Sequence, residues 1–224
     1  MQISKALCVL AALGSIISLS AVAGSTEPTT SSSLGGESAI RDTPYQVGEK
    51  MPNITLPAIG KDGKETEASL ESMLADGPVV LTFFRGSWCP YCVTELKAVE
   101  KRIKKIEALG ASVLAISPEQ PAETVKLDKK LKLDFVLATD HNNVVARQLG
   151  LLFQMPDEMI EKYKEYKIDV PQSNGTETWQ LPIPATYVID TDRTIRFAFV
   201  DVDYSKRANY DDVLEILEEI KNDG

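Results

Sequence analysis

A strand-to-helix junction at residues 79–100 constrains the fold of this chain more than any other segment. The apolar run Val79–Phe84 is typical of a buried strand, and residues 93–100 predict an amphipathic helix. Between them lies Trp88-Cys89-Pro90-Tyr91-Cys92, with two cysteines three positions apart. Unpaired N–H groups and the helix dipole favour a thiolate at a helix N-terminus, and the thiolate is the nucleophile. The junction therefore predicts a redox-active dithiol, Cys89 and Cys92.

The remainder of the chain alternates strands and helices. Apolar periods and Gly or Pro breaks predict strands at 79–84, 111–117 and 135–138 and helices at 89–109, 121–131, 143–149 and 211–222. A hairpin region at 53–63 and a helical turn at 69–74 come first, and strands 185–190 and 195–200 form a hairpin turning at 191–193. This order predicts an α/β, thioredoxin-like fold with a central mixed sheet flanked by helices. Segment 151–180 does not fit the pattern, and we predict only a helix from Pro156 to Tyr166 within it.

The amino terminus has the pattern of an export signal. Lys5 precedes an apolar stretch from Ala6 to Val22, which ends in Ala21-Val22-Ala23. This predicts a signal peptide over residues 1–23 and a periplasmic or secreted protein. The alternative is an uncleaved anchor, but the stretch is barely long enough to span a bilayer. Residues 24–43 are rich in Ser, Thr, Gly and Pro and predict a flexible linker, with one domain at 44–224.

The cysteine count and the charge exclude several function classes. Cys8 lies in the predicted signal, so the mature chain keeps only Cys89 and Cys92, which is too few for a disulfide framework. A net charge of -9 disfavours nucleic acid, and no stable membrane association is expected. With His141 as the only histidine, we expect no zinc site and no cofactor. A copper-binding protein using Cys89, Cys92 and His141 remains an alternative.

Four motifs carry a family resemblance. They are Val47-Gly48-Glu49-Lys50-Met51-Pro52, Phe84-Arg85-Gly86-Ser87-Trp88-Cys89-Pro90-Tyr91-Cys92, Ala115-Ile116-Ser117-Pro118 and Leu181-Pro182-Ile183-Pro184-Ala185-Thr186. From about Val47 to Leu217 the chain resembles the peroxiredoxin-like group of the alkyl hydroperoxide reductase / thiol-specific antioxidant family, within the thioredoxin superfamily. The resemblance implies an antioxidant enzyme that reduces hydroperoxides and is itself reduced by a thioredoxin-like protein.

The cysteine segment departs from the family's Pro-x-x-x-Thr-x-x-Cys loop. The resemblance places the attacking cysteine at Cys92, with Cys89 at the Thr position and Arg85 at the Pro position. The family's later arginine corresponds to Pro184. These departures look like thioredoxin, in which Cys89 would attack, Cys92 would resolve and Pro184 would be the cis-proline facing the pair. Thioredoxin's buried acid is replaced by Phe83, so proton transfer for the second thiol has no assigned residue.

Two reactions therefore stay open. In the first, Cys92 attacks a peroxide and becomes a sulfenic acid, with which Cys89 condenses. In the second, a protein disulfide reductase, Cys89 attacks a substrate disulfide and Cys92 resolves it. Arg85 is either a cation that activates a thiol or stabilises a leaving oxyanion, or a solvated loop residue. Trp88 and Pro90 are expected to shape the site, although aromatic core packing is the favoured account of Trp88.

Overall fold

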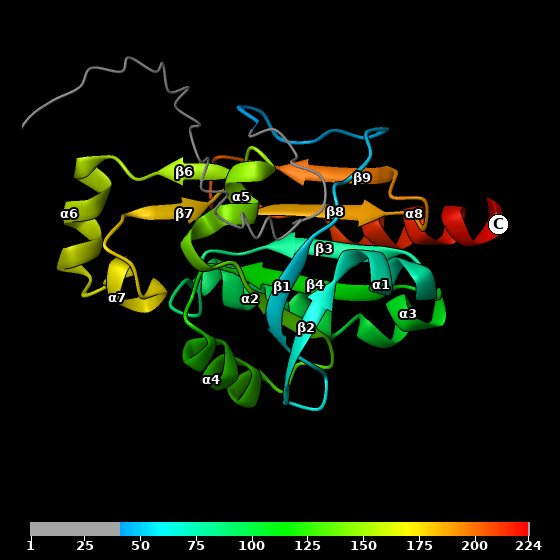
Figure 1. Ribbon diagram of the computed structural model, residues 1–224, viewed down its shortest axis with the longest axis horizontal. Coiled ribbons are helices and arrows are strands. Elements are labelled where there is room, and N and C mark those ends of the chain that lie inside the picture. The colour runs from blue at the N-terminus through cyan, green and yellow to red at the C-terminus, as the bar shows by residue number, and fades with distance from the viewer. Residues whose placement is uncertain (1–40, 224) are drawn as a thin grey trace, which may run out of the picture. The chain divides into compact units, whose positions relative to one another are not determined.

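The computed structural model describes residues 41–223. The predicted signal peptide and most of the predicted linker lie outside this range. Seven strands form one sheet in the order β2-β1-β5-β4-β3-β8-β9 (Figure 1). Their bounds are β1 Thr55–Ile59, β2 Glu65–Ser69, β3 Val79–Phe83, β4 Ser112–Ser117, β5 Val136–Thr139, β8 Ala185–Ile189 and β9 Ile195–Val200.

The sheet is mixed, as predicted. The central strand β3 runs parallel to β4 and antiparallel to β8, and β4 runs parallel to β5. Strands β1 and β2 are antiparallel to each other, β1 is antiparallel to β5, and β9 is antiparallel to β8. The carboxyl ends of β3, β4 and β5 consequently meet at one edge, where the cysteine loop begins.

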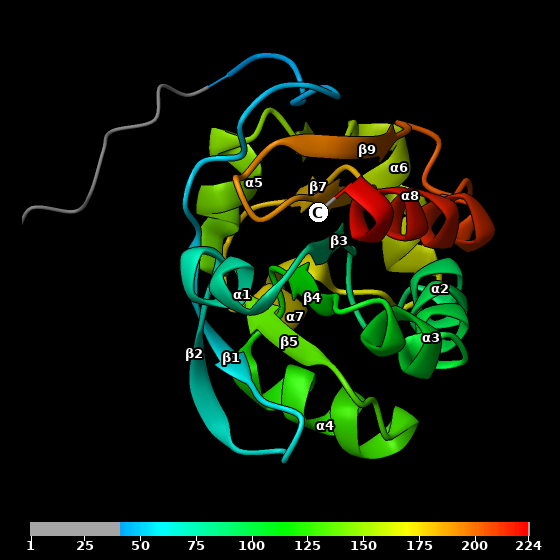
Figure 2. The same ribbon diagram turned by 90° about the vertical axis from the view of Figure 1, so that its right-hand side faces the viewer.

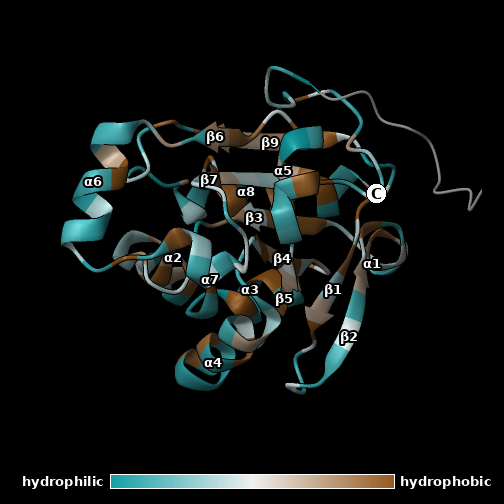
Figure 3. Cartoon of the chain, turned by 60° about the vertical axis from the view of Figure 1, so that its left-hand side comes forward, coloured by the Kyte–Doolittle hydropathy of each residue, from teal (hydrophilic) through white to brown (hydrophobic). Residues whose placement is uncertain are grey.

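Two helical layers cover the sheet (Figure 2). Helices α2 Pro90–Glu100, α3 Ile103–Ala108, α4 Pro121–Leu131 and α8 Tyr210–Asp223 supply side chains to the core on one face. Helices α1 Leu70–Asp76 and α5 Val144–Gln148 supply the other. Successive side chains of β3 point to opposite faces of the sheet, so Val79 and Leu81 pack in one core and Val80 packs in the other. Figure 3 shows the hydrophobic strands enclosed between helices with hydrophilic outer residues.

The segment that the sequence left unplaced is a small subdomain beside the cysteine loop. It comprises β6 Leu152–Gln154, α6 Asp157–Glu165, α7 Val170–Asn174 and β7 Gln180–Pro182, and β6 pairs with β7 in a sheet of two strands. The predicted helix from Pro156 to Tyr166 is confirmed as α6. Four buried residues form its own core, to which Trp88 adds: Met155, Tyr163, Val170 and Leu181.

Two predicted helices differ from the structure. The helix predicted over 89–109 is broken into α2 and α3, because Lys101 N still bonds to Lys97 O but Arg102 N bonds to Val99 O at 2.8 Å, three residues back, which tightens the chain there. The break keeps Ile103 and Ile106 in the same core as α2. The helix predicted from Asn143 begins at Val144, since Asn142 and Asn143 are left-handed. Among residues 41–223, no helix has the length and apolar character needed to cross a bilayer.

Candidate active site

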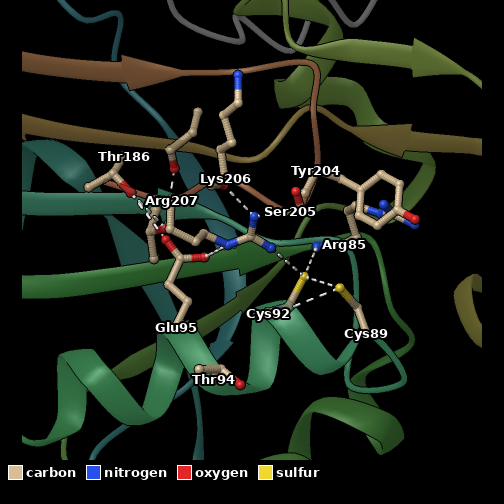
Figure 4. Close-up of polar contacts among 12 residues, drawn as sticks. Arg85, Cys89, Cys92, Thr94, Glu95, Thr186, Tyr204, Ser205, Lys206 and Arg207 are labelled. Carbon is tan, nitrogen blue, oxygen red and sulfur yellow. Dashed lines mark hydrogen bonds and ion pairs between the residues drawn. The ribbon is translucent and has the colours of Figure 1, made fainter. Parts of the chain in front are cut away.

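The two cysteines stand at the start of α2, directly after the loop that follows β3. Cys89 caps the helix, and its Sγ accepts a hydrogen bond from Cys92 N at 3.4 Å. Pro90, exposed at the first helical position, fits this place because it needs no hydrogen-bonded amide. The two Sγ atoms are 2.7 Å apart (Figure 4). Cys89 is 2% exposed and Cys92 is fully buried, so the pair faces the protein interior rather than bulk water.

The pair shares one negative charge. A hydrogen bond from the Cys92 thiol, a further one from the Cys92 amide and the nearby charges of Arg85 and Arg207 lower the pKa of Cys89 to about 6. Burial, followed by the hydrogen bond to Cys89 and its charge, raises the pKa of Cys92 well above its ordinary value. At neutral pH, Cys89 is therefore the thiolate and Cys92 the proton donor.

An arginine from the far end of the chain reaches the second cysteine. Arg207 precedes α8, and its Nη2 lies 3.3 Å from Cys92 Sγ, while Arg85 N lies 3.5 Å from the same sulfur (Figure 4). Arg207 Nε also lies 2.5 Å from Oε2 of Glu95, a buried residue on α2. The site thus holds a guanidinium that an ion pair orients toward Cys92.

Glu95 is the buried acid that the sequence analysis could not assign. Its Oε1 accepts hydrogen bonds from Tyr210 Oη at 3.3 Å and Thr186 Oγ1 at 3.4 Å. Burial raises the pKa of this carboxyl to about 7, although Arg207 opposes the shift. Spacing could have identified Glu95, because a residue three positions after Cys92 lies on the same helix face.

Arg85 is enclosed by aromatic rings. Only 3% of the residue is exposed, so the interpretation as a solvated loop cation is wrong. Its Cζ lies 4.1 Å from the ring centroid of Tyr204, 5.3 Å from that of Trp88 and 5.4 Å from that of Tyr163. Trp88 also packs edge-on against Tyr163 at 5.7 Å, so it both fills the core and borders the site. Burial lowers the pKa of Arg85, and the two cysteines oppose that shift.

A buried carboxylate ties the cysteine loop to the inserted subdomain. Glu119, just beyond β4, is fully buried, and burial raises its pKa. It accepts hydrogen bonds from Ser87 N at 2.6 Å and Ser87 Oγ at 2.9 Å. Ser173 Oγ on α7 donates a third at 2.8 Å. The segment 151–180 therefore walls the site, which its sequence did not indicate.

Comparison with known proteins identifies the family. Residues 47–198 match the family model described as the AhpC/TSA family. The chain belongs to the AhpC/TSA family. A Mycobacterium tuberculosis protein named as a peroxiredoxin is 25% identical over 178 residues, which cover 79% of this chain and 99% of that protein. A chloroplastic peroxiredoxin Q from Populus jackii is 28% identical over 126 residues, covering 55% and 57%.

Solved structures confirm the predicted thioredoxin-like fold. Peroxidoxin BcpB from Mycobacterium tuberculosis has a TM-score of 0.58 and 24% identity, covering 78% of this chain and 97% of that one. The reduced 2-Cys peroxiredoxin of Plasmodium vivax has a TM-score of 0.61 and 16% identity, covering 80% and 83%. The family match and the peroxiredoxin relatives show that the AhpC/TSA protein described here is a thiol-dependent oxidoreductase, as predicted.

The resemblance places Pro184 at the position of the family's later arginine, and the arginine side chain that lies beside Cys92 Sγ in this structure is that of Arg207. Pro184 is buried next to Ala185, which pairs with Phe83 at the end of β3. Pro184 therefore lies at the same sheet edge as the cysteine loop, and its predicted contact with the pair stays a prediction.

Copper binding required His141 beside the cysteines. His141 is exposed in the short 3-10 turn His141–Asn143. Within residues 41–223, no three His, Cys, Asp or Glu side chains are grouped as a metal site would need. The structure therefore gives the copper alternative no support.

Proposed function

We propose that this AhpC/TSA protein is an antioxidant peroxidase that reduces small hydroperoxides through Cys89 and Cys92. The match to the AhpC/TSA family carries the proposal, and the burial of both thiols in the reduced protein agrees with it. A hydroperoxide is small enough to enter a site whose nucleophilic residue is 2% exposed, whereas a protein disulfide must bring its sulfur into line with the attacking thiolate. The matches to peroxiredoxins support the same oxidant.

The lowered pKa of Cys89 favours this residue as the first nucleophile. Its thiolate attacks the peroxide, a sulfur–oxygen bond forms, the O–O bond breaks, and the leaving alkoxide or hydroxide takes up a proton from water to become an alcohol or water. The resemblance to the family favours Cys92 for this step, but Cys92 is the thiol that holds the proton. The product is a sulfenic acid on Cys89.

The second step follows from the loss of charge on Cys89. The hydrogen bond to Cys89 and its negative charge both hold the pKa of Cys92 up, and oxidation removes them. Arg207 and the Arg85 amide, which favour a thiolate, stay beside Cys92 Sγ. Cys92 therefore loses its proton more readily after Cys89 has reacted, and its thiolate displaces hydroxide from the sulfenic acid. The hydroxide takes up the proton that Cys92 released, so the products are the Cys89–Cys92 disulfide and water.

A thioredoxin-like protein is the proposed reductant, because dithiol exchange returns such a disulfide to the reduced state. The proposed location is the periplasm or the exterior of the cell, on the pattern of residues 1–23. Amino-terminal sequencing of the mature protein from fractionated cells tests this location. A first residue of Gly24 supports export, and an intact amino terminus in the soluble cytoplasmic fraction contradicts it.

Stopped-flow oxidation of the reduced protein by hydrogen peroxide tests the reaction. The expected result is a rate constant far above that of a free thiol, with a sulfenic acid trapped on Cys89 in the Cys92→Ser variant. A sulfenic acid trapped on Cys92 in Cys89→Ser at the wild-type rate would reverse the order of attack. Free-thiol reactivity, with mixed disulfides on Cys89 in Cys92→Ser, would indicate a disulfide reductase instead.

A further inference from the structure

Loop 201–207, which lies between β9 and α8, has a shape that its own side chains determine. Asp201 Oδ1 accepts a hydrogen bond from Asp203 N at 2.9 Å, and Asp201 Oδ2 pairs with Lys206 Nζ at 3.0 Å. Asp203 Oδ1 accepts hydrogen bonds from Ser205 N at 3.0 Å and Ser205 Oγ at 2.7 Å. Asp side chains commonly close turns by bonding to the backbone two residues further on. The loop therefore has a defined shape that does not depend on an apolar core.

The same loop borders the cysteine pair. Arg207 Nη2 lies 3.3 Å from Cys92 Sγ (Figure 4). The ring centroid of Tyr204 lies 4.1 Å from Arg85 Cζ. Tyr204 also contacts Tyr91, which stands between the two cysteines in the sequence, edge-on with ring centroids 5.9 Å apart. The loop and the first turn of α2 thus form one continuous surface beside the pair.

This surface exposes apolar side chains. Val202 is 74% exposed, Tyr91 is 47% exposed, and Pro90 between the cysteines is exposed as well. Among residues 41–223 only five large hydrophobic side chains are exposed, and two of the five belong to this surface. Apolar side chains that gather in one exposed place indicate a contact surface, because scattered ones need no explanation.

One charge on this surface is left for a partner. Asp203 follows Val202 directly and is exposed, and the exposed cation of the loop, Lys206, pairs with Asp201 instead. Charged groups at the edge of an interface attract partners of the opposite sign. The surface is thus complementary to a protein face that is apolar at its centre and carries a lysine or arginine at its edge.

The disulfide that the proposed reaction leaves has one sulfur within reach. Cys92 is fully buried and Cys89 is 2% exposed, so a partner thiolate attacks Cys89. A bond forms between the partner's sulfur and Cys89, the Cys89–Cys92 bond breaks, and the electron pair moves to Cys92 beside Arg207. The partner's second thiol then displaces Cys89 as a thiolate, and its proton passes to Cys92. The partner leaves as a disulfide, oxidised by two electrons.

Burial of the target sulfur makes an in-line approach rare in a free collision, so a surface that holds the partner beside Cys89 has a large effect on the rate. We propose that Tyr91, Val202 and Asp203 form the docking surface for the thioredoxin-like reductant. The tyrosine and the valine meet an apolar face around the partner's cysteines, and the carboxylate meets a cation at the edge of that face. This inference rests on the proposed cycle, in which such a protein reduces the Cys89–Cys92 disulfide.

The test compares a protein reductant with a small one. Second-order rate constants for reduction of the oxidised protein by a bacterial thioredoxin and by dithiothreitol are measured by rapid quenching and alkylation of the free thiols. Val202→Ser should slow thioredoxin by about 5-fold and Tyr91→Ala by about 10-fold, as for side chains near the centre of an interface. The rate with dithiothreitol, which has no face to dock, should stay nearly the same.

Val47→Ser is the matched control for the valine. Val47 is 60% exposed, and its neighbour Gly48 donates a hydrogen bond to Ile195 O at the start of β9, whereas Val202 follows the end of that strand. This variant loses the same apolar surface away from the cysteines, so it should change neither rate.

Asp203→Asn tests the charge. The amide oxygen still accepts the hydrogen bonds that shape the loop, so only the charge is lost. Added salt should slow thioredoxin with the wild type, and this dependence should weaken in Asp203→Asn, because screening acts on the charge that was removed. Asp76→Asn is the control, since Asp76 is exposed before the amino end of β3, whereas the cysteine loop follows its carboxyl end.

Three results would overturn the docking surface: equal slowing of both reductants in Val202→Ser and Tyr91→Ala, no slowing of thioredoxin, or a wild type that thioredoxin reduces no faster than dithiothreitol does. An unchanged salt dependence in Asp203→Asn would remove the carboxylate from the surface. Oxidation by hydrogen peroxide is measured without thioredoxin, so a fast wild-type rate would uphold the peroxidase function in each case. Peroxide reactivity no better than a free thiol's, with the selectivity for thioredoxin intact, would remove the peroxidase function and keep the docking surface.

Discussion

Replacing Cys92 by Ala should raise the pKa of Cys89, because the Cys92 thiol is its strongest stabilising partner at 2.7 Å. A pKa of about 6 against an ordinary 9.0 means that the site favours the Cys89 thiolate by about 4 kcal/mol. One hydrogen bond to a charged group contributes about 1.5–3 kcal/mol. Its loss should bring the pKa of Cys89 to between about 7 and about 8.

The ultraviolet absorbance of the thiolate measures this change without any reagent entering the buried site. At pH 6.5 the thiolate fraction should fall from about three quarters to about one tenth. Cys92→Ser is the matched control, since its hydroxyl still donates, and its titration should lie between those of the wild type and Cys92→Ala. A Cys92→Ala midpoint equal to that of the wild type would refute the hydrogen bond as the main cause.

Three further predictions concern the surroundings of the pair. Burial raises the pKa of Glu95 in the folded protein from 4.5 to about 7. The protonated carboxyl therefore stabilises the fold by about 3 kcal/mol below pH 4.5, and this stabilisation is lost as the pH rises to 7. Glu95→Gln should flatten this decline in thermal unfolding, while exposed Glu218→Gln should not; equal slopes would contradict the assignment. Arg207→Met should lower the free energy of unfolding by denaturant at pH 8 by about 3–5 kcal/mol, and adding Glu95→Gln should restore part of that loss. If the two substitutions instead lower the free energy of unfolding by the sum of their separate effects, the two side chains do not form an ion pair. Tyr163→Ala should cost about 3 kcal/mol and accelerate alkylation of Cys89, and an unchanged alkylation rate would mean that α6 does not cover the site.

Local patterns predicted the elements that local forces determine. Helix α4 runs from Pro121 to Leu131 as expected, because Pro121 fits a first turn and Lys132 takes the left-handed conformation that ends the helix. The hairpin of β8 and β9 also matches, since its apolar strands flank a polar turn. The dithiol at the junction of β3 and α2 was predicted from the same kind of signal.

The features that were missed depend on contacts between distant residues. Arg207 lies 115 positions from Cys92 in the sequence, and no pattern near Arg207 distinguishes it from a surface arginine. The subdomain was unplaced because β6 and β7 are three residues each and pair only with one another. The break between α2 and α3 contains neither Gly nor Pro, so it had no sequence signal.

The contact that Glu119 makes with Ser87 and Ser173 has a consequence for turnover. A protein reductant must reach a sulfur that is buried in this structure, and the hydrogen bonds of Glu119 to Ser87 and Ser173 hold the cysteine loop and α7 together over it. The rate at which the oxidised enzyme is reduced would then follow how often the cysteine loop and α7 move apart. Hydrogen exchange at the Ser87 amide reports that frequency directly, and Glu119→Gln, which weakens the contact, should raise exchange and recovery in parallel.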